Sequence, residues 1–113
     1  LAKAIIQAHA DLKGIFGSNE GSAVGVVNAV TELKKTGIVV IGYDSGKAQM
    51  DAIRSGTMAG AITQDPIGIG YWAVKAAYMA YKGEKVEKTI DTGFHWYDKT
   101  NIDSEEIKPL LYE

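Results

Sequence analysis

Three polar side chains in this sequence, Asn19, Asp44 and Gln64, each come at or just after the end of an apolar run. Asn and Gln amides both donate and accept hydrogen bonds, and an ionised carboxylate is a strong acceptor. In an open parallel sheet the carboxyl ends of the strands share one edge, and ligands bind there. If the three runs are strands of such a sheet, these residues would suit a neutral ligand rich in hydroxyl groups.

Residues of these types can also have an ordinary structural role, as the N-cap of a helix or in a turn. Asn19 and Asp44 are typical of helix N-caps and tight turns, and taken one at a time this role is favoured for both. Gln64 differs, because Asp65 is the expected N-cap of a helix that Pro66 begins. With the capping role already filled, a ligand contact is favoured for Gln64.

The elements that must position these residues alternate between strand and helix. The β-branched run at 38–43 shows no alternation, which indicates burial on both faces and a parallel sheet covered by helices. We therefore predict an α/β fold, a three-layer αβα parallel sheet with right-handed crossovers. Three strands are few, so further strands must come from other sequence or from a partner chain. The predicted strands are about 13–17, 38–43 and 59–63, and the predicted helices are about 1–9, 24–35, 47–55 and 66–82.

The last third of the sequence is organised differently. The helix from 67 to 82 is apolar nearly all round, so it should be covered on more than one side. A charged connector at 84–88 leads into extended chain at 89–97, where Phe94 and Trp96 alternate and predict one buried face. A short helix is expected towards Leu111.

Composition excludes several classes of function. The 113 residues carry a net charge of −2 without a concentrated basic patch, which argues against a nucleic-acid surface. The absence of cysteine excludes a disulfide, a thiol nucleophile and a cysteine-ligated metal. His9 and His95 lack metal-ligand spacing, and the glycines do not form a phosphate-binding motif. We predict no catalytic residue, no metal and no cofactor.

Four segments, taken in order, resemble the ribose-type periplasmic sugar-binding proteins. Asn19 and Asp44 are separated by 25 residues, and Asp44 and Gln64 by 20, which is similar to the pattern of that family. Glu20 departs from the aspartate often found there, so the resemblance assigns it no ligand role. The resembling segments are 16–25, 39–44, 53–66 and 82–86.

The resemblance implies the solute-binding component of an ABC sugar importer, of the type I two-lobed kind. It implies that Asn19, Asp44 and Gln64 line one wall of an interlobe cleft and bind a monosaccharide. A membrane permease would be the partner, and the location would be periplasmic or extracellular, with a lipid anchor as one option. The resemblance also divides the chain, because 1–64 would be part of the carboxy-terminal lobe. Residues 65–113 would hold the hinge crossover, the long helix and an extended segment that pack on an amino-terminal lobe.

We therefore expect a fragment with half a cleft. Half a cleft does not exclude water, so each hydrogen bond to a sugar is worth little, and normal affinity is not expected. The apolar helix at 67–82 is expected to mediate self-association, including exchange of elements between copies.

Two other functions remain open. The effector-binding domain of a lactose-repressor-like regulator has the same fold, although the lack of proline between Asp44 and Gln64 favours transport. An enzyme of flavodoxin-like or hydrolase type is disfavoured by the missing nucleophile, metal and phosphate motifs.

Overall fold

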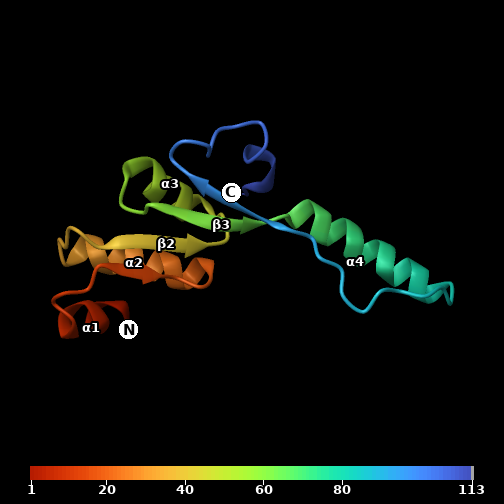
Figure 1. Ribbon diagram of the computed structural model, residues 1–113, viewed down its shortest axis with the longest axis horizontal. Helices are drawn as coiled ribbons and strands as arrows, with labels where there is room; N and C mark the ends of the chain where they lie inside the picture. The colour runs from red at the N-terminus through yellow and green to blue at the C-terminus, as the bar shows by residue number, and fades with distance from the viewer. Residues whose placement is uncertain (113) are drawn as a thin grey trace.

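A four-stranded sheet forms the body of the molecule in a computed structural model that describes residues 1–112 (Figure 1). The strand order is β1-β2-β3-β4, with β1, β2 and β3 parallel and β4 antiparallel to β3. The α/β class is therefore confirmed. The strands are β1 (Gly14–Phe16), β2 (Val39–Tyr43), β3 (Gly60–Gln64) and β4 (Phe94–Asp98).

The helices lie close to their predicted positions. The second helix begins four residues earlier than predicted, because the Asn19 side chain caps it and brings Glu20 into its first turn. Gly56, with a φ of 82°, ends the third helix in the left-handed region. The helices are α1 (Ala2–Ala8), α2 (Glu20–Glu32), α3 (Lys47–Ser55) and α4 (Pro66–Tyr81), followed by the short 3-10 helix η1 (Lys108–Leu110).

The direction of β4 departs from the predicted parallel sheet. The chain leaves β3 at Gln64, runs out through α4, returns along 84–93 and pairs Phe94 with Gln64. It re-enters the sheet at the end where β3 stops, so β4 has to run the opposite way. The extended segment expected to pack on another lobe therefore packs on this one. Tyr97, Ile102 and Ile107 are buried in the same core as the helices.

The helix layer covers one face of the sheet. The chain crosses from β1 to β2 to β3 in one direction, and right-handed crossovers then place α2 and α3 on the same side. The covered face carries Val40 and Tyr97, both 0% exposed. The other face exposes Phe16, Val39 and Trp96. Within residues 1–112 the arrangement thus has two layers here, and the third layer of the predicted αβα sandwich is not present.

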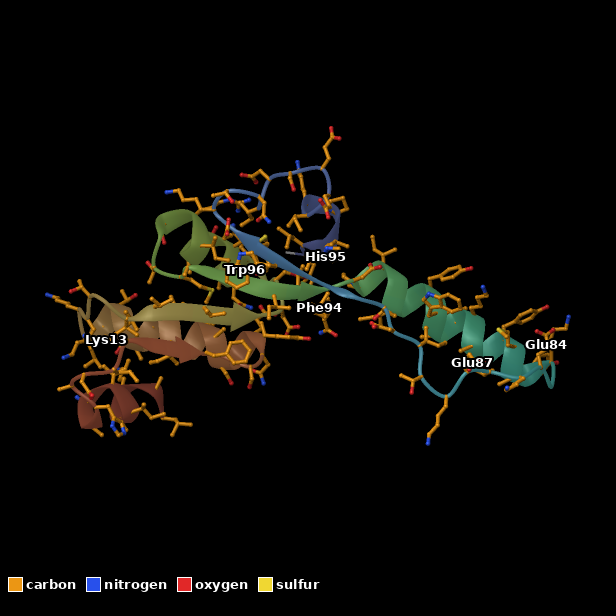
Figure 2. All side chains as sticks on the ribbon, viewed as in Figure 1. Lys13, Glu84, Glu87, Phe94, His95 and Trp96 are labelled. Carbon is orange, nitrogen blue, oxygen red and sulfur yellow. The ribbon has the colours of Figure 1, made fainter. Side chains whose placement is uncertain are left out.

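An arm made of α4 and the returning segment 84–93 projects from the body, which gives the molecule a long axis of 57 Å (Figure 1). No residue of α4 is buried, and Ile67 and Val74 are 68% and 73% exposed. Figure 2 places Glu84 and Glu87 far out on this arm, away from Trp96 on β4. None of the helices in the described part of the chain is long and apolar enough to span a bilayer.

The junction between β1 and α2 allows a test of the packing. A Cβ atom at Gly17 would lie 2.4 Å from the backbone Cα of Ala23 in α2. We expect Gly17→Ala to lower the free energy of unfolding by about 1–3 kcal/mol in chemical denaturation, because backbone has to move. The matched control Gly25→Ala has open space in the same helix and should raise stability by about 0.5–1 kcal/mol. Equal stability of the two variants would contradict the packing described here.

Candidate functional site

The carboxylate of Asp44 is the centre of the candidate site. Its Oδ2 accepts a hydrogen bond from the backbone N–H of Glu20 at 3.2 Å, and its Oδ1 accepts one from Gln64 Nε2 at 3.1 Å. These bonds join the end of β2 to the first turn of α2 and to the last residue of β3. The structure therefore brings Asp44 and Gln64 into direct contact, with Asn19 next to Glu20 in sequence.

The capping roles are distributed differently from the sequence prediction. Asn19 is the N-cap of α2, and its Oδ1 accepts a hydrogen bond from the Ser22 N–H at 2.8 Å. Asp44 does not cap α3, because Gly46 is that N-cap and no side chain caps it. Asp65 caps α4 through the Gly68 N–H, as predicted, which leaves Gln64 without a capping role.

The exposed Asn19 amide can still donate to a ligand. Its Nδ2 makes no hydrogen bond with any of residues 1–112, while Oδ1 is occupied by the cap. The Asp44 oxygens can each accept a further hydrogen bond, since a carboxylate offers about four lone-pair sites. The three predicted residues therefore keep donor and acceptor capacity on a partly exposed wall.

Asp44 has an unusual backbone, with a φ of 73° in the left-handed region. A non-glycine residue there costs about 1–3 kcal/mol and persists only where its surroundings fix it. The Asp44 N–H donates to the Ile62 carbonyl at 2.8 Å, and the Asp44 carbonyl accepts from the Tyr97 hydroxyl at 2.7 Å. The backbone conformation that aims the carboxylate is therefore held on both sides.

Tyr97 is a residue of the site that the sequence reasoning missed. Phe94 and Trp96 indicated a buried face, yet they are 71% and 42% exposed, and the buried face of β4 carries Tyr97 instead. The prediction of one buried face is therefore confirmed, and the face that is covered is the one opposite Phe94 and Trp96. Burial, followed by the charges of nearby groups including Glu20 and Asp44, raises the pKa of Tyr97 above its ordinary value.

Glu20 adds a second carboxylate close to Asp44. Its side chain lies against Gly46, where a Cβ atom would collide with the carboxylate, and it accepts from the Tyr112 hydroxyl at 3.4 Å. Neither Glu20 nor Asp44 takes part in an ion pair within residues 1–112. The described residues also contain no group of three potential metal-ligating side chains. Carboxylate oxygens at this position can accept hydrogen bonds from donors.

Two grooves lie beside the residues of the candidate site. A groove of about 480 Å³ follows the free edge of β1 between α1 and α2, and none of the three predicted residues lines it. Gln64 instead lines a groove of about 440 Å³ with Ile69 and Trp72 of α4. Asp44 lines neither of these two grooves.

Comparison with known proteins gives consistent matches. The model of the periplasmic binding protein domain matches residues 1–85. The ribose import binding protein of Bacillus subtilis (strain 168) is 34% identical over 86 residues, which are 76% of this chain and 28% of that protein. The chain thus spans under a third of the length of this curated relative.

Solved structures match almost the whole chain. A solute-binding protein of an ABC transporter from Agrobacterium vitis, with bound D-fucose, has a TM-score of 0.91 and 38% identity. The match covers 98% of this chain and 39% of that one. A protein from Brachyspira murdochii, described as an ABC transporter, LacI family transcriptional regulator, has a TM-score of 0.84 and 44% identity, covering 99% of this chain and 40% of that one.

The buried Tyr97 hydroxyl predicts a loss of stability at high pH. Because folding raises its pKa, the unfolded chain ionises first, near the ordinary value of about 10. The contribution of the protonated Tyr97 hydroxyl to the free energy of unfolding is therefore fully present below about pH 10, and it falls as the pH rises above that value. In urea denaturation, Tyr97→Phe should be less stable than wild type by about 0.5–1.5 kcal/mol near neutral pH. This difference should shrink above about pH 10.

Tyr81→Phe is the control, because Tyr81 is 88% exposed and should leave the wild-type pH profile unchanged. A constant difference between wild type and Tyr97→Phe across the alkaline range would contradict the burial of this hydroxyl.

Proposed function

This chain belongs to the periplasmic binding protein domain family, and on that premise we propose that it is part of the solute-binding component of an ABC sugar importer. The observation that carries the proposal is the Asp44 carboxylate, which joins two strand ends and the first turn of α2 while its oxygens can accept further hydrogen bonds. Of the relatives named above, one is described as a ribose import binding protein and one as a solute-binding protein with bound D-fucose.

In this proposal three side chains contact a monosaccharide. Asp44 accepts hydrogen bonds from sugar hydroxyls, which charged acceptors do strongly. Gln64 donates one Nε2 hydrogen to Asp44, which leaves its Oε1 as an acceptor and its second Nε2 hydrogen as a donor for the sugar. Asn19 donates through Nδ2, because its Oδ1 caps α2.

The surroundings of this wall follow from the same proposal. Residues 1–64, together with β4, would form part of a carboxy-terminal lobe, and Asp65-Pro66 would begin a crossover to an amino-terminal lobe. The support is that α4 has no buried residue although most of its surface is apolar. A membrane permease would receive the sugar, and the location would be periplasmic or extracellular, with a lipid anchor as a further element of the proposal.

Sugar binding by the 113-residue chain is the direct test of the wall. We expect D-ribose or D-fucose to shift NMR signals of Asn19, Asp44 and Gln64 with a midpoint in the millimolar range. The affinity should be weak because an open wall leaves water in competition for each hydrogen bond, which is then worth only about 0.5–1.5 kcal/mol. Asp44→Asn keeps the shape and tolerates the left-handed backbone, but should abolish the shifts by removing the charged acceptor.

The matched control is Asp51→Asn on the exposed side of α3, which should bind as wild type does. Sugar-induced shifts confined to other residues, or no shifts at high millimolar sugar, would contradict the proposed wall. Calorimetry showing micromolar affinity would contradict the expectation of half a cleft.

Self-association through α4 is a second part of the proposal. A folded chain of 12.1 kDa is expected to expose about 6,000 Å². This chain exposes 7434 Å². Large apolar side chains are exposed on α4 and on the open sheet face. Light scattering at high concentration should therefore detect species larger than a monomer.

Val74→Gln should reduce that association, because Val74 is 73% exposed on the apolar surface of α4. Lys88→Gln, on the returning segment, is the control that removes no apolar surface. A monodisperse wild-type monomer at high concentration would refute this part of the proposal.

The effector domain of a sugar-responsive regulator is the alternative function. The description of the Brachyspira murdochii structure names both a transporter and a LacI family regulator, at 44% identity. The sequence upstream of this segment in its gene, together with the neighbouring genes, distinguishes the two functions. A secretion signal ahead of this segment and neighbouring transporter genes would support import, whereas an upstream helix-turn-helix would support regulation.

A further inference from the structure

The backbone around Asp44 is held from behind by the last part of the chain, residues 94–112, which we call the C-terminal strap. The Tyr97 hydroxyl donates to the Asp44 carbonyl at 2.7 Å. The Tyr112 hydroxyl donates to Glu20 Oε2 at 3.4 Å. Each contact joins residues more than fifty positions apart in sequence, so the strap reaches the wall only through the fold.

The contact from Tyr97 controls the orientation of the Asp44 carboxylate. Tyr97 is 0% exposed, so its hydroxyl has no access to water and depends on the Asp44 carbonyl. The Asp44 N–H is tied to the Ile62 carbonyl on β3. These two bonds hold the peptide units on either side of Asp44, and in this left-handed conformation its side chain contacts Glu20 and Gln64.

A second contact fixes the neighbours of both site residues. Ser45 follows Asp44 and Thr63 precedes Gln64, and these hydroxyl residues are 0% and 1% exposed. Thr63 Oγ1 donates to Ser45 Oγ at 3.1 Å, and Ser45 Oγ donates to the Leu110 carbonyl at 3.5 Å. One carbonyl of the strap thereby sets the ends of β2 and β3 relative to each other.

We propose that the C-terminal strap positions the Asp44–Gln64 pair for the ligand, with Tyr97 as the main positioning residue. Tyr97 contacts the Asp44 backbone and not its carboxylate, so it acts on the ligand only through Asp44. The ligand in question is the monosaccharide of the proposed function. The geometric part, that Tyr97 holds the Asp44 and Gln64 side chains in contact, does not depend on that function.

The test compares Tyr97→Phe with Ile102→Val in the 113-residue chain. Ile102 is a buried residue of the same strap, 2% exposed, and its substitution should lower thermal stability by an amount similar to the loss of the Tyr97 hydroxyl. The readouts are the NMR signals of the Gln64 side-chain amide and the Asp44 and Glu20 backbone amides. A purely structural role of Tyr97 would affect the two variants alike.

We expect Tyr97→Phe to shift these signals and to speed exchange of the Gln64 amide protons with water several-fold, and to weaken sugar-induced shifts. Ile102→Val should leave the signals and the sugar response at wild-type values. Unchanged signals in Tyr97→Phe, or equal changes in both variants, would overturn the proposal.

Ser45→Ala covers the case in which Tyr97→Phe does not fold. It removes one hydroxyl between β2 and the Leu110 carbonyl and should shift the Asp44 and Gln64 signals in a folded chain, while unchanged signals would overturn the proposal. If Tyr97→Phe shifts these signals but the wild-type chain binds no sugar, the positioning role is supported and the result counts against the proposed function alone.

Discussion

One carboxylate at the end of β2 contacts both α2 and β3, and these two contacts hold the proposed wall together. Asp44 lies at the end of β2, accepts from the first residue of α2 and accepts from the side chain that ends β3. A negative charge at the N-terminus of α2 is favoured by the helix dipole, so this bond also stabilises the helix that follows Asn19. With its backbone in the left-handed region, Asp44 reaches both of these partners at once.

The order of strands and helices could be predicted because local sequence patterns determine it. The β-branched run before Tyr43 predicts a buried strand, and the Asp65-Pro66 pair predicts a helix start, and both predictions depend only on residues close together in sequence. The direction of β4 and the open sheet face depend on where a distant segment returns, and no local pattern records that. Phe94 and Trp96 show the limit, because alternation indicates that a strand has two different faces without telling which one is covered.

The candidate site could also be predicted only where the evidence lies in neighbouring residues. Gln64 was singled out because Asp65 had taken the local capping role, and the structure places its amide on Asp44. The expected cap at Asp44 was wrong, because its partner is a backbone N–H from α2, 24 residues earlier in the sequence. Tyr97 could not be found in this way, since its partner lies 53 residues away and only the paired sheet brings them together.

The arm has a topological consequence. Because Phe94 pairs with Gln64, residues 65–93 are an insertion into a β3–β4 hairpin. The chain therefore leaves the body and returns to it at the same point. The entropy lost on closing a loop grows slowly with its length, so the hairpin tolerates inserts of very different size. The register that places Gln64 beside Asp44 therefore does not depend on the length of the arm.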